Sequence, residues 1–128
     1  MNGWLAAPII LPFTMAAVSL LGRHRPRLQS GLAMLAAAGH LAVGAWLLYR
    51  THTGGISVLH VGSWQAPFGI ALVADHLSVL MLLITGVVYL AAAVYSRTDI
   101  DETAVQRGYY ALLHILVGGI SGAFLTGD

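Results

Sequence analysis

The sequence contains no cysteine and no lysine, and it has few charged residues of either sign. Without cysteine, the chain cannot form a disulfide, a thiolate metal site or a thiol nucleophile. Charged residues make up 9% of the 128 residues, whereas a soluble domain carries roughly 25% because its surface must face water. The net charge of +1 gives no electrostatic basis for binding nucleic acid. The surface of this chain must therefore face lipid.

Apolar segments fill most of the chain, in which 58% of the residues are hydrophobic and the mean hydropathy is +0.80. Four of them approach the length of about 20 residues with which a helix crosses the hydrocarbon core. The basic residues follow the first segment instead of preceding it, so we expect a retained span and not a cleaved signal. We predict an all-α membrane protein, a single membrane domain over residues 1–128, with about four transmembrane helices near residues 4–21, 31–49, 76–95 and 108–125.

The arginines predict how these spans are oriented. Residues 22–30, in which Pro26 breaks the loop, and residues 96–107 carry five of the six arginines; the connection from Arg50 to Asp75 carries the other one. Positively charged loops stay in the cytoplasm, so the two arginine-rich connections should lie inside and the long connection outside. Both termini should then lie outside.

The connection between the second and third spans has the pattern of a short β-hairpin. Residues 56–61 are rich in β-branched side chains, residues 68–73 form a second such run, and glycine and proline punctuate the join. We predict an extracytoplasmic hairpin over about residues 56–73, with Trp64 near the membrane interface. Because an isolated two-stranded hairpin is marginally stable in water, we expect it to need other protein to lie on.

Two histidines, His40 and His114, lie inside predicted spans, where an ionisable side chain is costly and is therefore a candidate for function. Neutral histidine is tolerated there if a carbonyl or hydroxyl group accepts its proton, and such packing is one interpretation. A second is a step on a proton route, because histidine titrates near neutral pH. A third is a small redox subunit that holds a haem between the two imidazoles, or a quinone.

Asp75 and Asp128 are two further candidates for ion transport, each next to a predicted span. Asp75 precedes the third span, with Ser78 three residues later. That spacing is typical of a helix cap, because a carboxylate there accepts free backbone N–H groups; an entrance for ions is the alternative. Asp128 follows the fourth span, and its other interpretation is a plain residue at the membrane interface.

No motif in the sequence indicates that the chain catalyses a reaction. The sequence has no nucleophile–base pair, phosphate-binding loop or metal-ligand spacing, so we predict no enzyme, no cofactor and no bound metal. The middle of each predicted span also lacks Lys, Arg, Asp and Glu, which proteins that move charge across the bilayer usually need. We therefore do not expect this chain to be a complete transporter.

Two stretches are similar to a known family. Residues 62–83 (GSWQAPFGIALVADHLSVLMLL) resemble a signature of the D subunit of Mrp-type multisubunit Na⁺/H⁺ antiporters, and residues 119–128 (GISGAFLTGD) resemble the end of that subunit's fourth helix. The first span, with Pro8 and Pro12, fits the same pattern. The resemblance covers essentially the whole chain and corresponds to the N-terminal part of such a subunit. The antiporter-like subunits of respiratory complex I share the architecture but match these stretches less well.

The resemblance implies a larger assembly. Such subunits have about fourteen helices, both termini outside and a β-hairpin that contacts the neighbouring subunit. They belong to bacterial cell-membrane complexes that exchange cytoplasmic Na⁺ for external H⁺. Partners would be the other antiporter subunits, the remainder of the same subunit with its later helices, and the lipid bilayer. The corner of the hairpin, formed by Trp64, Pro67 and Phe68, would contact the neighbouring subunit.

The family's ionisable transport residues lie in the fifth and later helices, so the resemblance transfers none of them to this sequence. The chain is either the N-terminal piece of a split subunit or a piece of a longer one. Our leading hypothesis is a scaffold that packs against ion-conducting helices and neighbouring subunits. The alternatives are the haem- or quinone-binding redox subunit and a stand-alone structural membrane protein.

Overall fold

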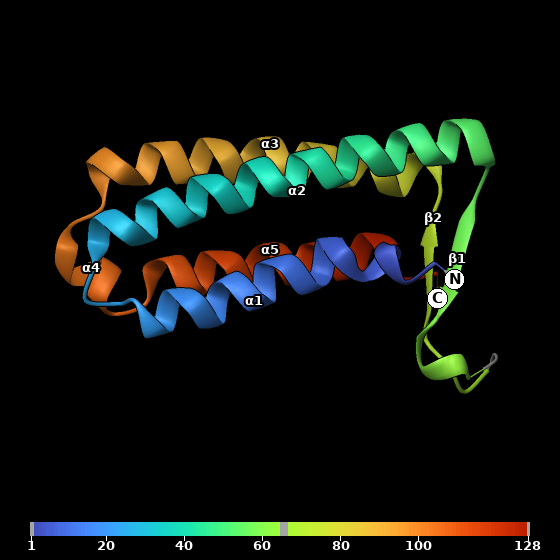
Figure 1. Cartoon of the computed structure of the whole chain (residues 1–128), viewed down its shortest axis with the longest axis horizontal. Helices are drawn as coiled ribbons and strands as arrows, with labels where there is room; N and C mark the ends of the chain where they lie inside the picture. Colours follow the sequence, from blue (N-terminus) through green and yellow to red (C-terminus); the bar gives the residue numbers. More distant parts are fainter. Residues whose placement is uncertain (1, 65–66, 128) are drawn as a thin grey trace.

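The computed structural model describes residues 2–64 and 67–127, and it shows two pairs of helices closed at one end by a small β-hairpin (Figure 1). Helix α2 packs along α3, and α1 packs along α5. The elements in chain order are η1 (Gly3–Ala6), α1 (Ala7–Leu21), α2 (Pro26–Gly54), β1 (Ser57–His60), η2 (Val61–Ser63), β2 (Ala71–Ala74), α3 (His76–Asp99), α4 (Glu102–Gln106) and α5 (Tyr109–Leu125). The predicted fold class, an all-α membrane protein with a short hairpin, is confirmed.

Three helical segments of the described chain are long and apolar enough to cross a membrane: Gly3–Leu21, Pro26–Gly54 and His76–Asp99. Helix α5 is equally apolar but has 17 residues, which at 1.5 Å per residue gives a length of about 26 Å. That is slightly less than the hydrocarbon thickness of about 30 Å.

The connections differ from the sequence-based expectation, because helices extend into both arginine-rich segments. Pro26 does not break a loop; it begins α2, since proline at the first helical position loses no hydrogen bond and has a suitable φ. The same helix continues to Gly54 and therefore includes Arg50. Helix α3 runs on to Asp99, and α4 occupies part of the next connection.

Glycines allow the helices to approach each other closely. A Cβ atom added at Gly86 on α3 would lie 2.8 Å from Cδ2 of Leu41 on α2, and one added at Gly118 on α5 would lie 2.9 Å from Cε2 of Phe13 on α1. Such distances are shorter than side chains tolerate. Small residues at these crossings let backbones pack where no hydrophobic effect acts between spans.

The hairpin is bonded to both ends of the described chain. Strands β1 and β2 are antiparallel, with Ser57 opposite Ala74. The side-chain Nδ2 of Asn2 donates a hydrogen bond to the Val58 carbonyl at 3.0 Å, and the Gly127 N–H donates to the Ala71 carbonyl at 2.8 Å. The hairpin therefore gains backbone and side-chain partners beyond its own two strands.

The same hairpin also contributes to the apolar core. Leu72 and Ala74 on β2 are buried against Leu5, Leu47 and Leu125 from η1, α2 and α5. The expectation that the hairpin needs other protein to lie on was wrong, because the helix ends of its own chain provide that support. Of the described residues of the hairpin, η2 at the end of β1 extends away from the helices (Figure 1).

Candidate functional site

A row of three buried polar rings crosses the middle of the helix bundle. His40 on α2, Tyr89 on α3 and His114 on α5 are each at most 1% exposed. The rings of His40 and Tyr89 meet edge to face with their centroids 6.1 Å apart, and those of Tyr89 and His114 do so at 5.7 Å. The Tyr89 hydroxyl and Nδ1 of His114 are hydrogen-bonded. The structure thus brings the two sequence-predicted histidines together through a tyrosine.

The local sequence explains how this row forms. His40 lies at the centre of α2, and Gly86 lies one turn before Tyr89 on α3. A Cβ atom at Gly86 would lie 3.3 Å from Cδ2 of His40, so the glycine leaves room for the imidazole. Because α2 and α3 approach closely here, the His40 and Tyr89 rings come into contact.

Three nitrogen atoms of the row have no hydrogen-bond partner among the described residues: both ring nitrogens of His40 and Nε2 of His114. A buried polar atom without a partner costs about 1–3 kcal/mol, so buried water commonly bonds such atoms. If the proton of neutral His114 is on Nε2, the Tyr89 hydroxyl donates to Nδ1 and the Nε2–H group needs an acceptor. If the proton is on Nδ1, that N–H donates to the hydroxyl oxygen and Nε2 needs a donor. The row is therefore able to hold and pass protons if water or another polar group reaches it.

The row does not fit a haem held between the two imidazoles. The Tyr89 ring lies between them, and Nδ1 of His114 already bonds to its hydroxyl. Nor do the described residues contain a group of three or more His, Cys, Asp or Glu side chains that could hold a metal ion.

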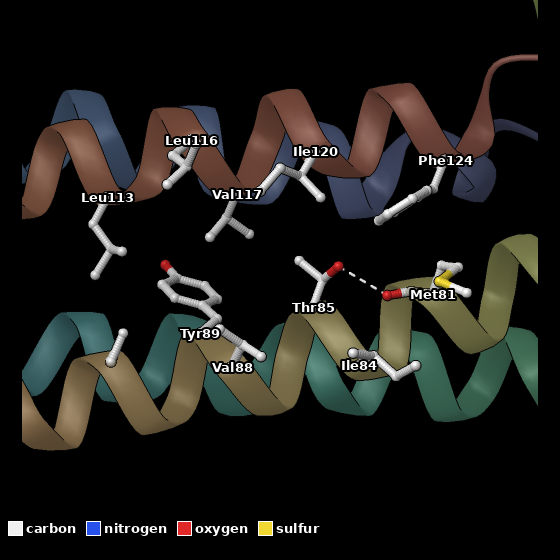
Figure 2. A pocket seen from close by; sticks show the side chains of 11 residues that line it. Met81, Ile84, Thr85, Val88, Tyr89, Leu113, Leu116, Val117, Ile120 and Phe124 are labelled. Atoms are coloured by element: carbon white, nitrogen blue, oxygen red, sulfur yellow. Dashed lines mark hydrogen bonds between the residues drawn. The ribbon is translucent and has the colours of Figure 1, made fainter.

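An apolar groove of about 250 Å³ lies beside the row, between α3 and α5 (Figure 2). Eleven residues line it, and in Figure 2 Tyr89 and Thr85 point from α3 toward α5, where Leu113, Val117 and Ile120 face them. The hydroxyl of Thr85 donates to the Met81 carbonyl at 2.8 Å, so its proton is already used and only its oxygen could accept a hydrogen bond from a ligand. The groove therefore presents hydrocarbon to whatever covers it, with the Tyr89 ring in its wall.

Asp75 lies far from the row, at the N-terminus of α3. Its Oδ1 accepts hydrogen bonds from the backbone N–H and the hydroxyl of Ser78, both at 2.7 Å. These bonds stabilise the ionised carboxylate and lower its pKa below the usual 3.8. The geometry is that of a helix cap. Asp128 lies outside the described residues.

The hairpin corner is exposed. Phe68 is 84% exposed, and Trp64 and Pro67 are exposed as well. Their predicted contact with a neighbouring subunit stays a prediction.

Sequence reasoning missed Tyr89. Its hydroxyl is a polar group in the middle of an apolar helix, and that was the signal available. The buried Gln29 and Ser19 were also missed; their side-chain polar atoms have no hydrogen-bond partner among the described residues.

Comparison with known proteins identifies relatives over the whole length of the chain. It is 34% identical over 128 residues to the D subunit of a Na⁺/H⁺ antiporter from Alkalihalophilus pseudofirmus and 33% identical over 128 residues to the protein of the same name from Bacillus subtilis. The chain is a homologue of these antiporter D subunits. A Rhizobium meliloti protein, named as the probable D subunit of a K⁺/H⁺ antiporter, is 38% identical over 138 residues. No family model matches.

These relatives confirm the resemblance seen in the sequence, and their names describe components of ion transporters. The match covers 100% of this chain but 26%, 26% and 25% of the three relatives. The chain therefore spans about a quarter of the length of the relatives it matches. With its apolar helices, it is a multi-pass bacterial membrane protein.

Proposed function

We propose that this chain is the N-terminal four-helix part of a subunit of a multisubunit monovalent cation/proton antiporter, and that it serves mainly as a scaffold. One observation carries this proposal. Among the described residues, the Arg, Asp and Glu side chains lie near or beyond the ends of the four long helices, and the polar groups at the centre of the bundle include no carboxylate or guanidinium group. Charge movement through a membrane usually needs ionised residues at depth, so those would come from other helices.

The uncovered α3–α5 groove supports the same proposal. Several of its apolar side chains are exposed, among them Leu116 and Ile84. About three quarters of each relative's length has no counterpart in this chain. Later helices of the same subunit would pack in the groove, and the whole complex would exchange Na⁺ or K⁺ for H⁺, the ions named for the relatives.

The proposed orientation places both ends of the chain outside. Asn2 and Gly127 both bond to the hairpin, and five arginines lie toward the opposite end of the bundle. The positive-inside tendency places that opposite end in the cytoplasm. The corner of Trp64, Pro67 and Phe68 then contacts a neighbouring subunit outside the membrane.

In this proposal the polar row has an accessory role. His40 and His114, together with Tyr89, tune hydration or proton access near the conducting helices, and Asp75 acts as a cap. If Asp75 or Asp128 conducted ions, removing that carboxylate would stop transport.

The test compares assembly with transport in natively expressed protein purified in mild detergent. Intact-mass analysis should find this sequence in a complex whose chains bear lysine inside their spans. Trp64→Ala with Phe68→Ala should lower the amount of co-purifying chains several-fold. Ile56→Ala, which truncates another exposed side chain beside the hairpin, is the matched control and should leave assembly intact.

His40→Ala and His114→Ala should impair transport less than the corner variants impair assembly. If either histidine variant abolishes transport in a fully assembled complex, the scaffold proposal is wrong.

A further inference from the structure

A second cavity, of about 190 Å³, lies at the arginine-rich end of the bundle. It is formed where the start of α2, the end of α3, α4 and the start of α5 meet, the end of the molecule at which α4 is labelled in Figure 1. Its polar lining consists of Arg27, Ser30, Ser96, Arg97, Glu102 and Tyr110. We call it the headgroup cavity. It does not include the polar row or the α3–α5 groove.

Two guanidinium groups in the lining lack an ionic partner. Neither Arg27 nor Arg97 forms a salt bridge with a described residue, and the one side-chain hydrogen bond of Arg97 is a 3.5 Å contact from Nη1 to the sulfur of Met34. Glu102 is the single carboxylate that lines the cavity. The lining therefore carries a net charge of +1 and retains guanidinium N–H donors that would suit an anion.

The wall also has a tyrosine hydroxyl without a partner. Tyr110 is 1% exposed and lines the cavity; its hydroxyl makes no hydrogen bond with a described residue and is not among the fully buried polar atoms, so it retains contact with solvent. The hydroxyl of neighbouring Tyr109, by contrast, pairs with that of Ser96 at 2.6 Å. Water can bond to the Tyr110 hydroxyl when the cavity holds no ligand, and the same hydroxyl is able to donate a hydrogen bond to a polar ligand that enters the cavity.

The depth of the cavity in the membrane indicates which kind of anion it would meet. Helix α3 has 24 residues and is about 36 Å long, longer than a hydrocarbon core of about 30 Å. Its last turn, with Ser96 and Arg97, therefore reaches the depth of the lipid headgroups. Val94, three residues before Arg97 and thus beside it on the helix, is 49% exposed and offers apolar surface to an acyl chain.

We propose that the headgroup cavity binds the phosphate of an anionic phospholipid. Arg27 and Arg97 bond to the phosphate oxygens, the Tyr110 hydroxyl donates to one of them, and the acyl chains lie along the outer face of α3. Basic pockets between spans commonly hold lipid headgroups in this way. The proposal requires that the chain lie in a membrane, and it does not depend on antiporter activity.

The test uses the natively expressed protein in mild detergent, together with any co-purifying chains. Native mass spectrometry measures how much of the protein that contains this sequence retains phosphatidylglycerol in competition with phosphatidylcholine of the same acyl chains. We expect a preference for phosphatidylglycerol and a loss of about tenfold in Arg27→Gln/Arg97→Gln, because hydrogen bonds to charged groups are the strong ones. Tyr110→Phe, which removes one hydroxyl, should lose less.

The matched control is Arg23→Gln/Arg107→Gln, which removes the same charge from the same end of the molecule but outside the cavity lining. It should retain the preference. Glu102→Gln should strengthen binding of phosphatidylglycerol, whereas it would weaken binding of a cation.

Three results would overturn the proposal: no preference between the two lipids, an equal loss in the control pair, or weaker binding in Glu102→Gln. Inorganic phosphate is tested in a separate arm. If it binds without lipid and shows the same dependence on Arg27 and Arg97, the ligand is free phosphate and the lipid assignment is wrong. If Arg27→Gln/Arg97→Gln fails to fold, the lipid preferences of Tyr110→Phe and Glu102→Gln still test the proposal.

Discussion

The hydroxyl of Tyr89 on α3 is hydrogen-bonded to Nδ1 of His114 on α5, 25 residues later in the chain. This bond joins the two helices between which the apolar groove opens. It also gives a buried imidazole one of the two partners that it needs, and the other has to come from water or from another helix.

Removing that hydroxyl should destabilise the bundle. In Tyr89→Phe, Nδ1 of His114 loses its hydrogen-bond partner, and neither ring nitrogen then has one among the described residues. We therefore expect a loss of about 1–3 kcal/mol, seen as a lower melting temperature in detergent. Tyr95→Phe is the control, since Tyr95 is exposed on the same helix. Equal melting of both variants would mean that the Tyr89–His114 bond contributes nothing.

Close packing of α2 and α3 predicts that alanine substitutions at two glycines, Gly86 and Gly119, differ in their effect on stability. Gly86→Ala would bring a Cβ atom within 2.8 Å of Leu41 and 3.3 Å of His40, and overpacking of this kind costs about 1–3 kcal/mol. Gly119→Ala has no atom within 4 Å of the new Cβ and should be neutral or stabilising. Thermal unfolding of the two variants measures the contrast; if Gly86→Ala melts no lower than Gly119→Ala, the close approach of the helices is not as described.

The Asp75 cap predicts a pH dependence whose sign is set by its lowered pKa. A carboxylate with a lowered folded pKa stabilises the fold fully above its unfolded pKa, and this stability is lost as the pH falls through the folded value. Asp75→Ala should therefore cost about 1 kcal/mol at neutral pH, and the difference in melting temperature from the unmodified protein should shrink below pH 3.8. Asp75→Asn is the control, because asparagine caps equally well without titrating. A difference that grows on acidification would contradict the assignment.

Arg50 should stabilise the hairpin end of the bundle through two indoles. Its guanidinium carbon lies 5.5 Å from the ring centroid of Trp4 and 5.6 Å from that of Trp46. We expect Arg50→Met to cost about 0.5–1 kcal/mol and to shift tryptophan fluorescence emission. Arg107→Met removes an exposed arginine at the other end and should leave the emission unchanged.

Filling the α3–α5 groove should block assembly. Leu116 lines the groove, whereas Leu35 is exposed on α2. We expect Leu116→Trp to reduce co-purification of lysine-bearing membrane chains several-fold and Leu35→Trp to leave it unchanged. Co-purification that survives Leu116→Trp would show that the groove is not where the later helices pack.

Much of the local structure was predictable from the sequence. Apolar runs of nearly 20 residues predict membrane helices because the bilayer sets their length. β-branched runs on either side of Gly62 predict a hairpin because glycine readily adopts the positive φ that tight turns need, and Gly62 has a φ of 71° in the structure. The spacing of Asp75 and Ser78 predicts the observed helix cap. Pro26 was misinterpreted because proline occurs both in loops and at the first position of a helix, where it is over-represented.

The sequence by itself determined where the centres of the four long helices lie and where α3 begins, because those properties depend on runs and spacings within a few residues of each other. Only the tertiary structure decided that Tyr89 lies between His40 and His114, and that the hairpin rests on its own helix ends. It also placed Arg27 and Arg97 beside one cavity. These relations depend on how α2, α3 and α5 pack, and helix periodicity specifies an apolar face without specifying which other face it will meet.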